Sequence, residues 1–278
     1  MSRLERTFEN LRRRGRRGLV TFTTAGDPDL PRSADILRVL DRAGADVLEV
    51  GVPFSDPLAD GPVIQRASER ALRAGATLAR VLDLVEATRP EISAGIVLFT
   101  YANPIVRMGM TRFVERAAAA GVDGVLALDL PIEEAEGFRE ATIAVGIDPI
   151  FLLSPTTTDE RIRRAAELGR GFLYGLSRLG VTGARSTIAQ GAEALVGRIR
   201  SATALPIALG FGISRPEHVA EVGRWADAAV VGSALIEVIA RAAPNDVLGD
   251  VEGYVRWLRG EAGAAAPSAA VPATAGER

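Results

Sequence analysis

Eight short apolar runs, separated by segments with helical spacing, limit the fold of this chain more than any other feature. Each run is rich in Val, Ile, Leu or Ala, as are strands that are buried on both faces of a parallel sheet. The runs begin at Leu19, Val47, Gly95, Gly124, Pro149, Gly171, Pro206 and Ala228. Eight strand–helix units in a chain of 278 residues predict an α/β protein, a (β/α)8 TIM barrel, in preference to an open doubly wound sheet.

The segments between these runs predict the helices. Those from Ser33, Thr111 and Asp159 start on a capping residue and end on Gly, as capped helices do. An Arg-rich segment from Leu4 predicts an extra N-terminal helix that covers the barrel floor, and a short helix is expected after the eighth strand. We therefore predict one barrel domain over residues 1–262 and a disordered, Ala- and Pro-rich tail over residues 263–278.

Missing residue types exclude several kinds of chemistry. The chain has no cysteine, which excludes thiol nucleophiles, thiolate metal sites and disulfides. It has no lysine either, which excludes a Schiff base to a carbonyl substrate or to pyridoxal phosphate. His218 is the single histidine, and we place it on the surface of a helix without a catalytic part. Acid–base chemistry must therefore fall largely to carboxylates and tyrosine.

Charge and hydropathy indicate the cellular compartment of the chain. Its formal net charge is −2, which gives no general attraction to nucleic acid or to an anionic membrane. The first residues carry mixed charge without the apolar core of a signal peptide, and no later stretch is apolar for long enough to span a bilayer. We expect a cytoplasmic chain.

Two carboxylates mark the end of the second run and the loop that follows it. Glu49 closes the run, and Asp60 comes later in a loop stiffened by three prolines in the stretch EVGVPFSDPLADGP. A carboxyl group that points into an apolar barrel mouth has a raised pKa and can exchange protons. Glu49 could equally form a salt bridge with an arginine, and Asp56 and Asp60 could be turn-capping residues.

Three glycine-rich loops form a second candidate site. They are GVTGARS from Gly180, GFGIS from Gly210 and VGSAL from Val231. In (β/α)8 barrels, the loops after the last two strands and the start of a short helix often bind phosphate through backbone N–H groups. Each loop alone is more often a tight turn, but together they predict a phosphorylated small molecule as the ligand.

Several large side chains stand in the strands or at their ends: Phe22, Tyr101, Leu126, Tyr174 and Phe211. Each of them alone would be assigned to the core, and a tyrosine there is usually a packing residue whose hydroxyl has a partner. Together they could equally line a flat apolar pocket for an aromatic substrate.

From Phe8 to about Arg259 the chain resembles the alpha subunit of tryptophan synthase. The motifs that carry the resemblance are TTAGDP, LEVGVPFSDPLADGPVIQRA, YANP, LDLPIEE, SPTTTDERI, SRLGVTGARS and GFGIS. The resemblance implies a lyase of L-tryptophan biosynthesis that cleaves indole-3-glycerol phosphate into indole and glyceraldehyde 3-phosphate. This retro-aldol reaction needs neither a metal nor a cofactor on this chain.

The resemblance also implies roles for individual residues. Glu49 would transfer protons, Asp60 would hydrogen-bond the indole N–H, and Tyr174 would shape the catalytic site beside them. Residues 178–187, with Arg178 and Thr182, would form a mobile lid, and Phe99 and Leu128 depart mildly from the family. The phosphate site would comprise Gly183, Gly212, Gly232 and Ser233, and the indole pocket Phe22, Ile64, Tyr101, Leu126 and Phe211.

A partner is implied as well. In the family, the PFSDP and YANP loops meet a beta subunit that holds pyridoxal phosphate, in an alpha2beta2 complex. A stand-alone lyase that releases free indole would keep the same catalytic residues, so it remains the alternative. A non-catalytic phosphate-binding barrel is the third hypothesis, and the presence of Glu49, Asp60 and Tyr174 together counts against it.

Overall fold

The computed structural model describes residues 1–176, 191–210, 212–261 and 263–264. Its strands are β1 (Gly18–Thr24), β2 (Val47–Gly51), β3 (Gly95–Thr100), β4 (Gly124–Ala127), β5 (Asp148–Ile150), β6 (Leu152–Leu153), β7 (Leu173–Leu176), β8 (Ile207–Gly210) and β9 (Ala228–Val231). All eight apolar runs of the sequence therefore form strands. Most of the predicted tail lies outside the described residues.

The strands form a barrel whose pairs are all parallel. Their order is β5-β4-β3-β2-β1-β9-β8-β7-β6. Only Phe151 separates β5 from β6 along the chain, so these two short strands are the halves of one bent strand. Because they stand at the two ends of the strand order, they close the barrel. The (β/α)8 prediction is confirmed, and the strand predicted as sixth is β7 because the fifth is split.

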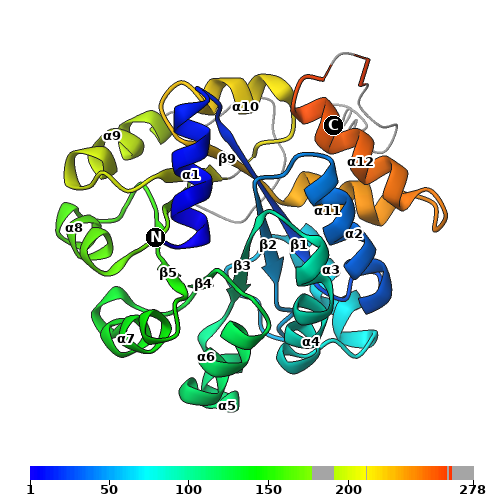
Figure 1. Cartoon of the computed structure of the whole chain (residues 1–278), viewed down its shortest axis with the longest axis horizontal. Helices are drawn as coiled ribbons and strands as arrows, with labels where there is room; N and C mark the ends of the chain where they lie inside the picture. The colour runs from blue at the N-terminus through cyan, green and yellow to red at the C-terminus, as the bar shows by residue number, and fades with distance from the viewer. Residues whose placement is uncertain (177–190, 211, 262, 265–278) are drawn as a thin grey trace, which may run out of the picture.

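Helices surround the strands as a ring (Figure 1). In chain order they are α2 (Leu30–Arg42), α3 (Pro62–Arg73), α4 (Leu78–Thr88), α5 (Ala102–Met108), α6 (Met110–Ala119), α7 (Glu136–Ala144), α8 (Asp159–Leu168), α9 (Ala192–Ala202), α10 (Pro216–Val222), α11 (Ser233–Arg241) and α12 (Val247–Leu258), with 3-10 helices η1 (Arg89–Glu91) and η2 (Ile132–Glu134). Both α11 and α12 follow β9, which supplies the short helix expected after the last strand. None of the helices in the described ranges has the length and apolarity that crossing a membrane would take.

Local sequence sets several helix starts. The side chain of Asp29 accepts a hydrogen bond from the Arg32 N–H and caps α2, whose first turn also holds Pro31. This helix therefore begins at Leu30, ahead of the Ser33 start expected from the sequence. Thr158 caps α8 in the same way, through the N–H of Arg161, in agreement with the predicted start at Asp159.

The N-terminal helix α1 (Arg3–Arg13) closes the floor of the barrel. Its buried residues Leu4, Phe8 and Leu11 belong to the apolar cluster inside the barrel. A Cβ atom at Gly95 would lie 2.5 Å from a methyl carbon of Leu4, and one at Gly124 would lie 2.9 Å from the other. Glycine at the start of β3 and β4 therefore makes room for Leu4, whose burial stabilises the fold by about 2 kcal/mol.

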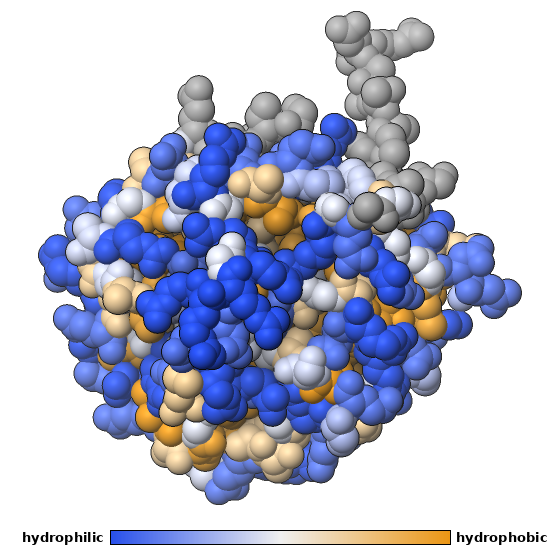
Figure 2. All heavy atoms as spheres, turned by 45° about the horizontal axis from the view of Figure 1, so that its top comes forward, coloured by the Kyte–Doolittle hydropathy of each residue, from blue (hydrophilic) through white to orange (hydrophobic). Residues whose placement is uncertain are grey.

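Strand alternation divides the core into two parts. In β2, Leu48 and Val50 belong to the larger cluster between strands and helices, whereas Val47 belongs to the cluster inside the barrel. Because successive side chains point to opposite faces of a strand, residues at odd positions of β2 face the interior. The surface seen in Figure 2 is mainly hydrophilic, with hydrophobic side chains in scattered patches.

The predicted surface position of His218 is wrong. This residue of α10 is buried, and its Nδ1 accepts a hydrogen bond from the Ser214 N–H at 3.3 Å. Because α10 packs against α12, one face of this short helix lies inside the protein. His218 therefore helps to hold the loop before its own helix.

Candidate active site

The side chain of Glu49 points into the barrel mouth. Glu49 follows Val47 by two residues in β2, and its neighbours in register are Phe22 of β1 and Val97 of β3. Val47 and Val97 belong to the interior cluster, so Glu49 shares their face. It lies near the C-terminal end of its strand, which is the end where (β/α)8 barrels carry their active sites.

Glu49 is completely buried, at 0% exposure. Neither of its carboxyl oxygens has a hydrogen-bond partner among the described residues, so the alternative of a salt bridge to an arginine is not seen in this part of the chain. Burial disfavours the charged form and raises the pKa of Glu49 to about 8. At neutral pH the group is therefore mostly protonated, with its oxygens available to a ligand.

Tyr174 of β7 lies within electrostatic reach of Glu49. Burial raises the pKa of the Tyr174 phenol well above its ordinary value, and the Glu49 carboxyl raises it further. A Cβ atom at Gly210, on the neighbouring strand β8, would lie 2.9 Å from two ring carbons of Tyr174. Glycine at this position therefore gives the tyrosine ring its space beside Glu49.

Asp60 lies in the loop between β2 and α3 and is 6% exposed. The hydroxyl of Tyr101 donates to Asp60 Oδ2 at 3.2 Å, and Gln65 Nε2 donates to the Asp60 carbonyl oxygen at 2.8 Å. Burial raises the pKa of Asp60 to about 6, although the Tyr101 hydrogen bond opposes this rise. Asp60 is therefore mostly ionised at neutral pH, whereas Glu49 is mostly protonated.

An ion pair with a buried carboxylate fixes the helix that follows Asp60. Arg70 Nε and Nη2 in α3 donate to Asp27 Oδ1 and Oδ2, each at 2.7 Å. A Cβ atom at Gly26, which has φ of 94°, would lie 3.2 Å from the methyl group of Ala71 in α3 and 2.6 Å from that of Ala76 just after it. The loop after β1 therefore packs directly against α3, and the two-point ion pair holds this helix at the barrel mouth.

Three of the predicted indole-pocket residues that the structure describes belong to two apolar clusters, and the fourth makes polar contacts. Phe22 and Ile64 form a small cluster with Ala67 of α3 and Ile236 of α11. Leu126 belongs to the cluster inside the barrel. The remaining member, Tyr101, is buried and reaches Asp60, so it differs from the others in making polar contacts.

Four half-buried apolar side chains complete the barrel mouth. They pack against the top of the interior cluster and are Phe99, Leu128, Leu152 and Leu176. Phe99 also meets Phe22 edge to face, with ring centroids 5.2 Å apart. Each lies two residues beyond a member of the interior cluster, namely Val97, Leu126, Ile150 and Tyr174. Sequence reasoning named Phe99 and Leu128 only as departures from the family and did not name Leu152 or Leu176. Because side chains alternate along a strand, counting two residues beyond each interior side chain would have found all four.

The candidate phosphate site lies beside this apolar mouth. A Cβ atom at Gly232 would lie 3.5 Å from Phe22 Cβ, and α11 begins directly afterwards at Ser233. The N-terminus of a helix favours an anion through its unpaired N–H groups and its dipole. Gly212 has φ of 76°, a left-handed conformation that favours glycine. Gly183, Phe211, Arg178 and Thr182 lie outside the described residues.

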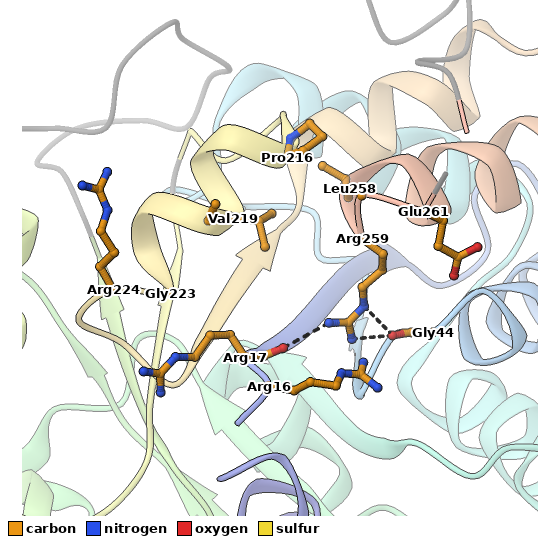
Figure 3. A pocket seen from close by; sticks show the side chains of 12 residues that line it. Arg16, Arg17, Gly44, Pro216, Val219, Gly223, Arg224, Leu258, Arg259 and Glu261 are labelled. Carbon is orange, nitrogen blue, oxygen red and sulfur yellow. Dashed lines mark hydrogen bonds between the residues drawn. The ribbon is translucent and has the colours of Figure 1, made fainter. Parts of the chain in front are cut away.

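A separate pocket lies at the opposite end of the barrel (Figure 3). Residues that precede strands line it, including Arg16, Arg17 and Gly44, together with parts of α10 and α12. Arg259 Nε donates to the Gly44 carbonyl oxygen at 2.9 Å, and its Nη1 donates to that of Arg17 at 3.1 Å. The Arg259 guanidinium thus binds the chain's own backbone. In the described ranges, no group of three or more His, Asp or Glu side chains could hold a metal ion.

Comparisons with known proteins agree on one family. The sequence model described as tryptophan synthase alpha chain matches residues 8–256. The tryptophan synthase alpha chain of Citrifermentans bemidjiense is 49% identical over 259 residues, which are 93% of this chain and 97% of that one. The corresponding chain of Methylococcus capsulatus is 52% identical over 243 residues, which are 87% and 91% of the two chains.

A solved structure gives the same result. A chain in a structure of Mycobacterium tuberculosis tryptophan synthase superposes with a TM-score of 0.87 at 37% identity, covering 93% of this chain and 97% of that one. The similarity thus extends over the whole barrel, including the strand ends that carry the site. The chain belongs to the tryptophan synthase alpha chain family.

Proposed function

We propose that Glu49 and Asp60 carry out the reaction of this family in this chain. The family's reaction is the cleavage of indole-3-glycerol phosphate to indole and glyceraldehyde 3-phosphate, which makes the chain a lyase of tryptophan biosynthesis. The observation that carries the assignment of residues is the pair of buried carboxyl groups with different pKa values. Burial raises the pKa of Glu49 to about 8 and that of Asp60 to about 6, so one is mostly an acid and the other mostly an anion at neutral pH.

The first step is proton transfer to the indole ring. Protonated Glu49 gives its proton to C3 of the ring, which makes the ring cationic and prepares the bond to the glycerol side chain for cleavage. The Asp60 carboxylate accepts a hydrogen bond from the indole N–H and stabilises the positive charge. The apolar mouth around Phe22, Phe99 and Leu128 excludes water and strengthens this attraction.

The second step breaks the carbon–carbon bond. The Glu49 carboxylate takes the proton of the side-chain hydroxyl, the electrons of the O–H bond form the aldehyde C=O, and those of the breaking bond return to the ring. Indole and glyceraldehyde 3-phosphate leave, and Glu49 is protonated as at the start. Tyr174 shapes the site beside Glu49, where it keeps its proton because burial raises its pKa.

The phosphate group of the substrate binds at the start of α11. Backbone N–H groups of Gly232 and Ser233, with the left-handed turn at Gly212, would hold it beside the pocket of Phe22. Gly183, Phe211 and the predicted lid residues Arg178 and Thr182 remain part of this proposal.

The chain itself is proposed to need no cofactor, and pyridoxal phosphate is assigned to a partner beta subunit. The chain has no lysine for a Schiff base. Two large apolar side chains near the mouth support a partner surface: Leu58, in the loop before Asp60, is 90% exposed, and Val106 of α5 is 73% exposed. We propose an alpha2beta2 complex in the cytoplasm.

Steady-state kinetics of indole formation test the roles of the two carboxyl groups. Glu49→Gln keeps the shape of the side chain but cannot transfer a proton, so kcat should fall by at least about a hundredfold with little change in KM. Asp60→Asn should also lower kcat, because a neutral amide stabilises the cationic ring less well. Near-normal kcat in Glu49→Gln would refute its role, and a change confined to KM in Asp60→Asn would make Asp60 a binding residue.

The pH dependence provides a second test. Because Asp60 must be ionised and Glu49 protonated, kcat/KM of the isolated chain should rise as the pH passes about 6 and fall as it passes about 8. In Glu49→Gln, the fall above about pH 8 should disappear from the residual activity.

A further inference from the structure

Tyr101 contacts the loop that carries Asp60 at three points. Its ring lies 5.0 Å from the ring of Phe54, with an angle of 32° between the planes. The N–H of Ala59 donates to Tyr101 Oη at 3.2 Å. The hydroxyl of Tyr101 donates to Asp60 Oδ2, also at 3.2 Å. One side chain therefore contacts the near end, the far end and the carboxylate of the same loop.

The outer part of this loop contributes little to its own anchoring. Ser55, Asp56, Leu58 and Ala59 are exposed. The N–H groups of Leu58 and Asp60 donate to carbonyl oxygens of the loop itself, those of Asp56 and Pro57. Such turns set the local shape of a loop but do not attach it to the barrel. The contacts with Tyr101 supply that attachment, together with the hydrogen bond from Gln65 of α3 to the Asp60 carbonyl oxygen.

Tyr101 is itself firmly placed. It is buried and lies between β3 and the start of α5. The N–H of Ala102 donates to Asp129 Oδ1 at 2.6 Å, and that of Leu128 donates to the Thr100 carbonyl oxygen at 2.8 Å. Hydrogen bonds to the segment that directly follows β4 therefore fix the backbone on both sides of Tyr101, and the side chain is a rigid support.

The direction of the hydrogen bonds favours an anionic Asp60. The Ala59 N–H occupies an acceptor position of Tyr101 Oη, which leaves the phenolic O–H to donate to the carboxylate. Burial and the nearby Asp60 raise the pKa of Tyr101, so the shared proton stays on the phenol. A hydrogen bond to a carboxylate is stronger than one to a neutral carboxylic acid.

We propose that Tyr101 is a positioning residue of the cleavage reaction, whose hydroxyl holds Asp60 as an oriented, ionised acceptor for the indole N–H. This inference rests on the role of Asp60 proposed above. It adds a polar function to a residue that the sequence places in the wall of the indole pocket. The ring contact with Phe54 holds the loop, and the hydroxyl sets the charge state and direction of the carboxylate.

The titratable groups around Asp60 come from three elements. Tyr101 contacts it from the end of β3, Asp129 acts on Tyr101 from the loop after β4, and Glu49 faces the same mouth from β2. Glu49 is mostly neutral below about pH 8, so it changes its charge little where Asp60 titrates. The substrate phosphate also titrates near pH 6. The informative quantity is therefore how far the acidic limb, the rise of kcat/KM at low pH, moves along the pH axis between two variants assayed with the same substrate.

Tyr101→Phe is the test, because it removes the hydroxyl and keeps the ring that packs on Phe54. The acidic limb of kcat/KM should move upward by about one pH unit, which lowers kcat/KM about ninefold at pH 5, about fivefold at pH 6 and hardly at all at pH 8. Phe54→Leu is the matched control, because it weakens the ring contact and keeps the hydroxyl. It should raise KM and leave the acidic limb in place.

A double-mutant cycle separates positioning from wall packing. If Tyr101 acts through Asp60, Tyr101→Phe should change the residual rate of Asp60→Asn less than twofold. Equal losses in both backgrounds, or an unmoved acidic limb in Tyr101→Phe, would overturn the inference. Full activity of Asp60→Asn by itself would instead overturn the role proposed for Asp60, so the two failures are distinguishable.

Discussion

The buried, unpartnered carboxyl of Glu49 should lower the stability of the folded chain as the pH rises. The ordinary pKa of a glutamate is 4.5, and burial raises that of Glu49 to about 8. Between these two values, the folded chain holds a proton at this site that the unfolded chain has lost. Stability must therefore fall as the pH rises from about 4.5 to about 8, and it stays level with respect to this group above that.

The size of the effect follows from the separation of the two pKa values. Each pH unit changes the folding equilibrium tenfold, or about 1.4 kcal/mol. Over about 3.5 pH units, from 4.5 to about 8, the free energy of unfolding should fall by about 5 kcal/mol. Such a loss is a large fraction of the 5–15 kcal/mol typical of a protein domain.

Glu49→Gln removes this dependence and keeps the shape of the side chain. The buried amide has its own cost, but that cost does not change with pH. The difference in stability between the variant and the parent should therefore grow by about 4 kcal/mol between about pH 5 and pH 8, in favour of the variant. The other titrating groups are common to both chains and cancel in the difference.

Urea unfolding at several pH values, followed by circular dichroism, measures the difference. The transition should first be shown to be two-state with the same m-value in both chains. Glu86→Gln, at an exposed position of α4, is the matched control and should leave the pH dependence unchanged. Parallel stability profiles of Glu49→Gln and the parent between about pH 5 and pH 8 would show that the Glu49 carboxyl is solvated or paired, contrary to its burial here.

Three further predictions concern the pocket, the phosphate site and the partner. Gly51→Ala should raise KM for indole-3-glycerol phosphate several-fold, because a Cβ atom there would lie 2.6 and 2.8 Å from two ring carbons of Phe22. The control Gly137→Ala has open space around the added Cβ atom and should leave KM unchanged. Gly212→Val should weaken glycerol phosphate binding at least about tenfold in calorimetry, and unchanged affinity would move the phosphate site elsewhere. A beta subunit from the same source should accelerate indole formation beyond additive activity. Leu58→Asp should weaken the complex, measured by light scattering, without slowing the isolated chain. A fast isolated chain that forms no complex would favour the stand-alone lyase.

The sequence by itself determined the barrel and the inward direction of its main functional groups. Eight apolar runs at regular intervals form the eight strands because a strand buried on both faces must be apolar along its whole length. Strand alternation places Glu49 on the same face as Val47, and this needs only the period of two residues. The burial of α1 could be predicted from the helical period instead, since Leu4, Phe8 and Leu11 fall on one face of the helix.

The tertiary structure decided which groups meet. The hydrogen bond between Tyr101 and Asp60 joins residues 41 positions apart, and Glu49 influences Tyr174 across the barrel. No local pattern encodes such pairs, because they arise only when the barrel closes. The same holds for the missing partner of Glu49 among the described residues and for the buried face of His218. Periodicity tells which side of an element a residue occupies, whereas its pKa and its partners depend on what the rest of the chain places on that side.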